Sequence, residues 1–266
     1  MKKNVVYGCY PSFFSEVIAN LMVKKGVPIS CIMLSAKKIR IEGEDITGLK
    51  GFLFLIKRFG CHYIGFQLFC NTILSFFCKL LYCLKGQRFY SFKKLCSQNR
   101  IKLIESEDFN KDIVKYDDID VFISMCLNQK LNSNFISSVK TLCINVHPSD
   151  IPNFGGVEPI IQLLLSGGRK MGITIHKMTE HIDLGDPILR EYVPVETKSY
   201  LHLMKDFIFI GVDMLDSLAK KDWKENLSSE VEYKYPYRSW PTKEELKLFR
   251  KKFNYISFYD LCIWKI

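Results

Sequence analysis

The chain has 266 residues, which is enough for one main domain with a smaller module attached. Hydrophobic residues make up 48% of the composition and charged residues 25%, values that exclude an intrinsically disordered chain. The formal net charge is +10, but Lys and Arg are dispersed along the sequence. This charge favours small anionic ligands as much as nucleic acid, and it equally fits a basic surface without a specific partner.

The ten cysteines include no C-x-x-C pair, and most of them lie within apolar runs. Such cysteines behave as small buried hydrophobes, and structural zinc sites usually show closer ligand spacing. We therefore expect free thiols and no metal. We also expect a reducing, cytoplasmic location, with the inner face of the membrane as an alternative place within it.

The N-terminal segment predicts a strand at 4–9, a helix that ends at Gly26 and a second strand at 27–34. This order predicts a βαβ unit in a parallel sheet. The turn after the first strand offers only Gly8 and lacks a G-x-G-x-x-G pattern, which argues against a dinucleotide site. Tyr10 and Ser12 at the start of the helix are candidates for contact with a substrate phosphate, although Ser12 equally fits a helix cap.

Residues 59–78 contain no charged side chain and are flanked by Lys57-Arg58 and Lys79. The length suits a membrane span, but His62, Gln67 and Asn71 interrupt the apolar run. The same spacing fits a helix buried on the sheet or facing a partner. We predict an apolar helical insertion at 59–85, and peripheral membrane contact through it is one reading.

Beyond Gln87 the pattern returns to strands alternating with helices. The strands are expected at 101–105, 119–125, 141–146, 172–177 and 188–195, and the helices up to 99, near 131–139, at 159–165 and at about 199–219. The fold class is therefore α/β, with a Rossmann-like, mostly parallel sheet and flanking helices. We expect a catalytic domain at 1–196 and a small helical or β extension at 197–266.

Two segments carry candidate chemistry. An apolar strand ends in Asn145 and His147, which alternation places on one face at the carboxyl edge of the sheet. Taken alone, both side chains fit a structural capping role as well as catalysis. The second segment, 172–189, contains Thr174, His176 and Asp183.

Together these segments read N-x-H-P-S at 145–149, G-x-T-x-H at 172–176 and I-D-x-G-D at 182–186. The Pro and Gly residues that follow the first motif make a fourth block. The four blocks in this order resemble the folate-dependent formyltransferase family over about 119–195. The resemblance implies the formyltransferase fold and a catalytic centre of Asn145, His147 and Asp183, with Asp186 as the alternative acid. His176 also belongs to the family pattern, and we place it behind the catalytic residues.

The chemistry of formyl transfer suits these residue types. An amine must lose a proton before it attacks a formyl carbon, and His147 suits that role of base. The Asn145 amide can donate to the oxyanion that develops, and Asp183 can orient the imidazole.

The resemblance also implies 10-formyltetrahydrofolate as cosubstrate, held along two loops. The candidate residues for this contact are Met125, Cys126, Leu127, Asn128, Thr179 and Ile182. The chain departs from the family pattern in the first of these loops and at Phe154-Gly155-Gly156, where an arginine often precedes the glycine.

The tail Tyr235-Pro-Tyr-Arg-Ser-Trp-Pro-Thr242 is similar to that of nucleotide-sugar N-formyltransferases, enzymes of surface polysaccharide synthesis such as that of O-antigen and lipopolysaccharide. Tyr235, Tyr237 or Trp240 could stack on a pyrimidine, and Arg238 could pair with a diphosphate. This reading expects a nucleotide-linked amino sugar such as dTDP-4-amino-4,6-dideoxyglucose as acceptor, no nucleic acid partner and a homodimer. The alternatives are glycinamide ribonucleotide or methionyl-tRNA as acceptor, or a non-catalytic protein that binds membranes or glycan carriers.

Overall fold

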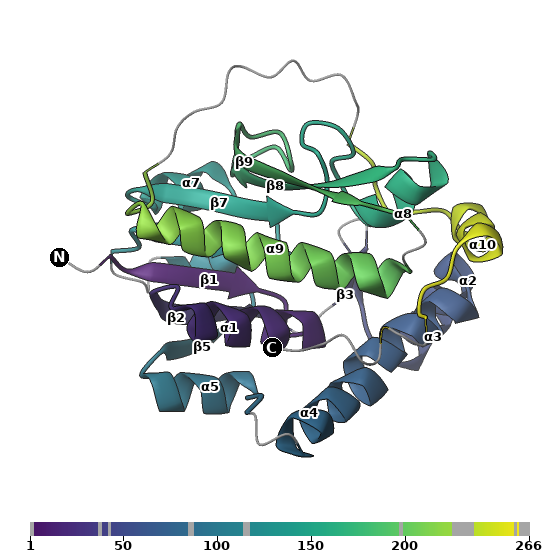
Figure 1. Cartoon of the computed structure of the whole chain (residues 1–266), viewed down its shortest axis with the longest axis horizontal. Coiled ribbons are helices and arrows are strands. Elements are labelled where there is room, and N and C mark those ends of the chain that lie inside the picture. The colour runs from purple at the N-terminus through teal and green to yellow at the C-terminus, as the bar shows by residue number, and fades with distance from the viewer. Residues whose placement is uncertain are drawn as a thin grey trace.

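A computed structural model describes residues 3–36, 39–41, 44–84, 88–113, 118–196, 199–224, 237–257 and 260. A sheet of seven strands forms its centre, with helices on both faces (Figure 1). The predicted α/β class with a mostly parallel sheet is confirmed.

The order of the strands in the sheet is β5-β2-β1-β6-β7-β8-β9. Five strands run parallel, and they are β1 (Val5–Cys9), β2 (Ile29–Ser35), β5 (Lys102–Ser106), β6 (Val121–Ser124) and β7 (Leu142–His147). The last two, β8 (Lys170–Lys177) and β9 (Pro187–Pro194), are antiparallel additions at one edge. The chain order reverses between β1 and β6, so ligands are expected at the carboxyl ends of these central strands. A separate two-stranded ribbon, β3 (Ile39–Ile41) and β4 (Glu44–Ile46), was not predicted.

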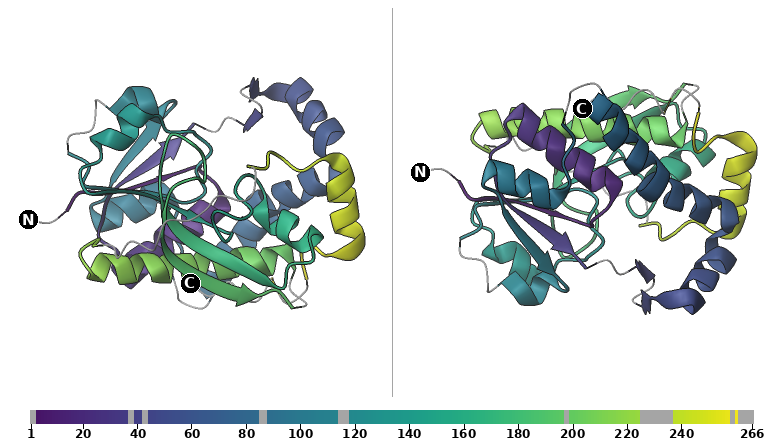
Figure 2. Two further views of the ribbon diagram at one scale, coloured as in Figure 1. Left: turned by 90° about the horizontal axis from the view of Figure 1, so that it is seen from above. Right: turned by 90° about the horizontal axis from the view of Figure 1, so that it is seen from below.

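The two faces of the sheet are covered by different helices. One face packs against α1 (Phe13–Lys25), α5 (Phe92–Asn99) and α9 (Tyr200–Lys220), and the other against α6 (Phe109–Asp112) and α7 (Ser133–Ser138) (Figure 2). Alternation along β1 explains the division, because Tyr7 belongs to the first core cluster and Val6 to the second. The helix α1 ends at Gly26 in a left-handed conformation, with φ of 83°, as its sequence predicts.

A helical arm flanks the carboxyl ends of the strands. It consists of α2 (Gly48–Phe59), α3 (Cys61–Phe69), a π-helical segment (Cys70–Leu74) and α4 (Ser75–Leu84) (Figure 1). The predicted apolar insertion is thus helical, and it begins earlier than expected. Within the described ranges, Cys61–Leu80 is the one helix long and apolar enough to cross a membrane, with a mean hydropathy of 1.2 and a third of its residues buried.

The C-terminal half of the chain closes the molecule. The helix α9 packs on α1 and β8 and contributes buried side chains to the main core, such as Leu201, Phe207 and Leu215. Two shorter helices, α8 (Pro159–Leu165) and α10 (Lys243–Lys252), contact each other, and α10 also contacts α2. The predicted division of the chain at residue 196 stays a prediction.

Candidate active site

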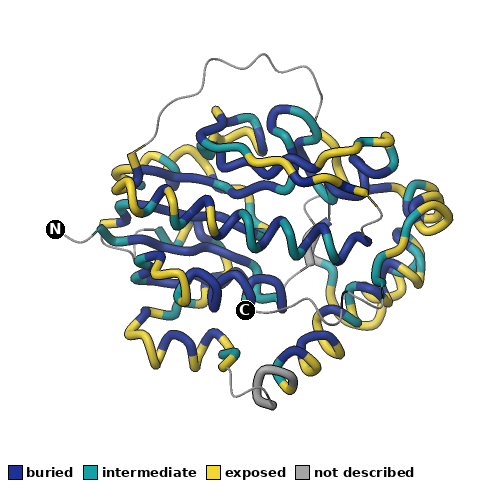
Figure 3. Tube along the Cα trace, viewed as in Figure 1, coloured by how far each residue is buried: buried dark blue, intermediate teal, exposed yellow. Residues whose placement is uncertain are grey.

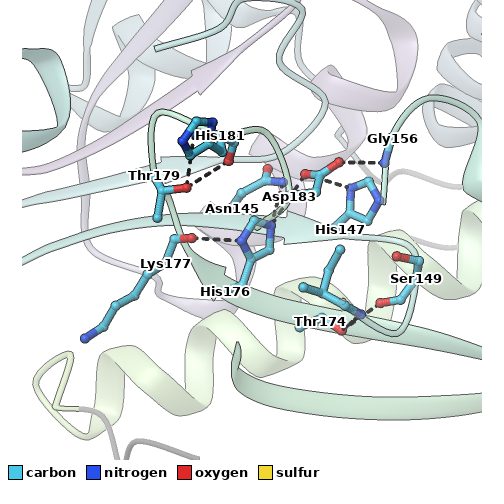
Figure 4. Close-up of polar contacts among 11 residues, drawn as sticks. Asn145, His147, Ser149, Gly156, Thr174, His176, Lys177, Thr179, His181 and Asp183 are labelled. Atoms are coloured by element: carbon cyan, nitrogen blue, oxygen red, sulfur yellow. Dashed lines mark hydrogen bonds and ion pairs between the residues drawn. The ribbon is translucent and has the colours of Figure 1, made fainter. Parts of the chain in front are cut away.

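The pairing of β7 with β8 brings the predicted catalytic side chains together. In this antiparallel pair Asn145 lies opposite His176, and His147 lies opposite Thr174. Asp183 approaches from the loop between β8 and β9, so the cluster unites residues from two strands and one loop (Figure 4). The alternative acid, Asp186, is exposed and uses its backbone carbonyl to accept from the Lys177 amide at 2.9 Å.

Asp183 is fixed by the backbone of the glycine loop at 155–157. Its Oδ2 accepts from the Gly156 amide at 2.8 Å, and its Oδ1 lies 3.6 Å from His147 Nδ1 and 3.7 Å from His176 Nε2. The carboxylate is 7% exposed, and the residue adopts a left-handed conformation with φ of 57°. A buried carboxylate held between a backbone amide and two imidazoles can stabilise positive charge on either ring.

His176 contacts the side chain of Asn145 and orients it. Its Nδ1 is 2.8 Å from the Lys177 carbonyl oxygen, to which it donates, so its Nε2 is left to accept from the Asn145 side-chain amide at 3.2 Å. Burial lowers the pKa of His176 to about 4, against the opposing effect of Asp183. A neutral His176 therefore fixes the orientation of the Asn145 amide at neutral pH.

His147 turns its Nδ1 towards Asp183. Its Nε2 is buried and makes no hydrogen bond to any part of the chain that the structure describes. The residue lines a cavity of about 920 Å³, at the upper end of the range for small-molecule sites. An imidazole with one nitrogen beside a carboxylate and the other without a partner, in a residue that lines a cavity, suits the role of general base.

The cavity is walled by several elements of the fold. Asn145, His147, His176 and Asp183 lie at the sheet, and Phe52, Leu55, Phe59, Tyr63, Ile64, Gln67, Leu68 and Asn71 come from the arm. Further side chains come from α8 and α9 and from the C-terminal segment. The cavity thus joins the motif region to parts of the chain that lie far from it in sequence.

Most of the predicted cosubstrate residues line this cavity, and they are Cys126, Leu127, Asn128, Thr179 and Ile182. Met125 does not, because its side chain is fully buried and packs towards Gly211, while its carbonyl oxygen accepts from the Tyr7 hydroxyl at 3.2 Å. Burial raises the pKa of Cys126 to about 12, so its thiol is uncharged and unreactive.

The predicted substrate residues separate into three groups. Tyr10, Tyr237 and Trp240 line the cavity, and Trp240 packs on Phe59 with ring centroids 5.3 Å apart. Ser12 caps α1 by accepting from the Ser15 amide at 3.2 Å and does not line the cavity. Arg238 also lies outside the lining, and its backbone pairs with the glycine loop at 155–157 while its side chain is exposed. Tyr235 falls outside the described residues.

One acidic residue of the cavity wall was missed by the sequence reasoning. Glu158 begins α8 in a left-handed conformation, and its carboxylate accepts from the hydroxyls of Tyr63 and Tyr200, the latter at 2.7 Å. Burial raises the pKa of Glu158. Its only sequence signal is a charged residue directly before the apolar helix that starts at Pro159. Across the described ranges, no group of three or more His, Cys, Asp or Glu is arranged to hold a metal ion.

Part of the chain matches a known protein family. Residues 84–207 match the formyl transferase family. A methionyl-tRNA formyltransferase of Ehrlichia canis (strain Jake) is 32% identical over 108 residues, which is 38% of this chain and 36% of that protein. The chain spans less than half the length of this relative and of the similar one from Thermotoga maritima.

Solved structures share the fold over most of the chain. An N-formyltransferase from Helicobacter canadensis, solved in complex with folinic acid and dTDP-3-aminofucose, has a TM-score of 0.54 and 12% identity. The match covers 90% of this chain and 71% of that one. A phosphoribosylglycinamide formyltransferase from Anaplasma phagocytophilum has a TM-score of 0.53 and 15% identity, and the match covers 90% of this chain and 99% of that one.

Proposed function

We propose, from the premise that residues 84–207 belong to the formyl transferase family, that this chain is a folate-dependent N-formyltransferase. The observation that carries the proposal is the arrangement of His147, a residue of the cavity wall whose Nδ1 lies 3.6 Å from Asp183 Oδ1 and whose buried Nε2 makes no hydrogen bond within the described residues. An imidazole with one nitrogen beside a carboxylate and the other without a partner suits the deprotonation of an amine.

The residues divide the chemistry between them. His147 Nε2 takes a proton from the attacking amine as its nitrogen forms a bond to the formyl carbon, and it returns the proton to the departing folate nitrogen. Asp183 stabilises the imidazolium between these two events. The Asn145 amide has two N–H groups, and since one donates to His176, the other serves the oxyanion that develops on the formyl oxygen.

For the cosubstrate, we assign 10-formyltetrahydrofolate to the part of the cavity lined by Cys126, Leu127, Asn128, Thr179 and Ile182. Two loops supply these residues, one after β6 and one after β8. The folinic acid named with the Helicobacter canadensis structure supports a folate ligand in this fold.

For the acceptor, we propose the amine of a nucleotide-linked amino sugar. Tyr10, Tyr237 and Trp240 offer aromatic faces in the same cavity, which suit a nucleobase or a sugar ring. The dTDP-amino sugar named with the Helicobacter canadensis structure supports this acceptor, and two other matched structures are named as a sugar 3N-formyl transferase and a sugar N-formyltransferase. The predicted homodimer, cytoplasmic location and role in surface polysaccharide synthesis stay predictions.

Two other acceptors, methionyl-tRNA and glycinamide ribonucleotide, are supported by the names of matched proteins. Curated relatives that match this chain in sequence include methionyl-tRNA formyltransferases, and a phosphoribosylglycinamide formyltransferase matches in fold. The region of sequence match lies around the catalytic cluster, whereas Tyr237, Trp240 and the cavity side of the arm lie outside residues 84–207. The acceptor-binding walls are thus the part of the site that sequence similarity does not cover.

The test is a panel of amine acceptors incubated with formyl folate and read by mass spectrometry. The panel contains dTDP-linked 3-amino and 4-amino sugars, glycinamide ribonucleotide and methionyl-tRNA. We expect formylation of a sugar nucleotide, and loss of it by about 10²–10⁴-fold in a His147→Ala variant. Transfer to another acceptor of the panel would refute the sugar assignment, and transfer to none would refute the proposed activity.

A further inference from the structure

The outer side of the helical arm exposes an unusual amount of apolar surface. Nine of the thirteen most exposed large hydrophobic side chains in the described residues lie between 49 and 80. They are Leu49, Phe52, Leu53, Phe54, Leu68, Ile73, Phe76, Phe77 and Leu80, and exposed segments recur along the arm in Figure 3. Exposed apolar patches of this kind commonly mark an interaction site.

These side chains form two stripes at helical spacing. Ile73, Phe76, Phe77 and Leu80 follow the i, i+3, i+4, i+7 pattern on the outer face, and Phe76 is 68% exposed. The opposite face of the same helix buries Cys70, Leu74 and Cys78 against the protein. Both faces of this helix are thus apolar, but the protein covers only one of them.

The second stripe lies on α2 and combines apolar with basic side chains. Lys50, Leu53, Phe54 and Lys57 are all exposed and again follow the i, i+3, i+4, i+7 pattern. Phe52 and Leu68 line the cavity, but the other seven exposed hydrophobics of the arm do not. A ligand in the cavity therefore does not account for this surface.

The net charge of the protein is concentrated in the arm and in the segment that directly follows it. Of the 38 Lys and Arg residues ten lie in 46–104, and of the 28 Asp and Glu residues none does. The rest of the chain therefore carries 28 residues of each sign and has a net charge of zero. Seen from below in Figure 2, α4 and the basic helix α5 lie on one side of the molecule.

We propose that the outer face of the arm, defined by Lys50, Leu53, Phe54, Lys57, Ile73, Phe76, Phe77 and Leu80, docks onto an anionic membrane surface. Apolar side chains flanked by basic ones are typical of helices that lie in the plane of a lipid interface. Anionic headgroups attract such basic side chains, and the attraction accumulates with each Lys or Arg near the surface. This inference concerns where the protein works and is independent of the reaction it catalyses.

The arm lies on the membrane in this proposal and does not cross it. Its inner face is fixed to the protein by Phe66, which stacks on Tyr255 with centroids 4.9 Å apart and meets Tyr200 edge-on at 5.3 Å. Lys79 pairs with Glu16 of α1 at 2.8 Å. A membrane span would break these contacts and would bring the charged pair into the bilayer.

Charge also argues against a second copy of the chain on this face. A symmetric dimer through the arm would bring Lys50 and Lys57 of two copies to one interface, and the arm has no Asp or Glu to offset them. An anionic partner removes this repulsion and covers the apolar side chains at the same time.

The experiment is flotation of the full chain with two kinds of vesicle, phosphatidylcholine alone and phosphatidylcholine with about one third phosphatidylglycerol. We expect binding to the anionic vesicles only, and weaker binding as salt is raised. A Phe76→Ser/Phe77→Ser variant and a Lys50→Gln/Lys57→Gln variant should each bind about tenfold or more weakly. None of the four residues lines the cavity.

Matched control variants lie on α10, outside the arm. Leu248→Ser replaces a hydrophobic side chain that is 42% exposed, and Lys251→Gln/Lys252→Gln removes two exposed charges, so both should bind anionic vesicles as the unmodified protein does. Absence of binding, or equal binding to both kinds of vesicle, would overturn the proposal. So would a dimer in analytical ultracentrifugation that the phenylalanine variant dissociates, in a protein that floats with neither vesicle.

Discussion

At the scale of single residues, the position of Asp183 distinguishes it from Asp186. Asp183 is buried beside His147, whereas Asp186 is exposed and contributes its backbone to β-sheet pairing. We expect Asp183→Asn to lower kcat by about 10²–10⁴-fold, because the imidazolium loses its counter-charge while Asn can still accept from the Gly156 amide. The matched variant Asp186→Asn should keep nearly normal turnover. Similar losses in both variants would remove this assignment.

The buried imidazole of His176 links the site to the stability of the fold in acid. Burial lowers its pKa from 6.5 to about 4, so between these values the unfolded chain binds a proton that the folded protein excludes. The free energy of unfolding should therefore be highest above pH of about 6.5 and decrease as the pH is lowered towards about 4.

Urea unfolding at several pH values measures this effect. A His176→Gln variant should show a shallower decrease over the same window, since glutamine does not titrate and can still accept from the Asn145 amide. Parallel curves for the two proteins would show that another group controls the acid sensitivity.

At the scale of elements, the glycine loop depends on close approach of the C-terminal segment. Gly156 has φ of 115°, and a Cβ there would lie 1.9 Å from the Arg238 carbonyl oxygen. Gly156→Ala should therefore lower the free energy of unfolding by about 2 kcal/mol or more and reduce turnover, since the same loop holds Asp183. Urea unfolding measures the first effect and a formyl-transfer assay the second.

Gly167→Ala is the matched control for this change. Gly167 also has a positive φ, at 79°, but nothing lies within 4 Å of its added Cβ. This variant should cost only about 1 kcal/mol and should leave turnover intact. Equal costs in the two variants would mean that backbone strain, and not the contact with Arg238, makes Gly156 necessary.

The elements themselves were predictable to different degrees. Strand periodicity and motif order indicated the sheet and placed Asn145 and His147 on one face, since both depend on local sequence. The environment of Glu158 was not predictable, because Tyr63 and Tyr200 lie far from it in the chain and reach it only through the tertiary fold. The capping role of Ser12 could be foreseen as an alternative, because a helix cap depends on neighbouring residues. The exposure of Arg238 depends on the tertiary fold and could not be foreseen.

At the scale of the whole molecule, the charge distribution corrects an interpretation made from composition. Lys and Arg are indeed dispersed, but Asp and Glu are absent from 46–104, so the net charge is not dispersed. The position of the arm beside the cavity depends on the tertiary fold, in which α2 and α3 contact the cavity with one side and solvent with the other. Sequence periodicity located the apolar helix but could not tell which of its faces the protein covers.

The bridge between Gly156 and Arg238 has a consequence for the order in which the protein matures. A nascent chain that has emerged as far as β9 already contains Asn145, His147, His176 and Asp183. It still lacks the segment around Arg238, whose backbone pairs with the loop at 155–157. That loop contains the Gly156 amide, which donates to the Asp183 carboxylate. Since folding tends to begin at the N-terminus during synthesis, the sheet can form before the Asp183 carboxylate is fixed. The loop that fixes Asp183 thus gains its backbone partner only after the rest of the cluster has been synthesised.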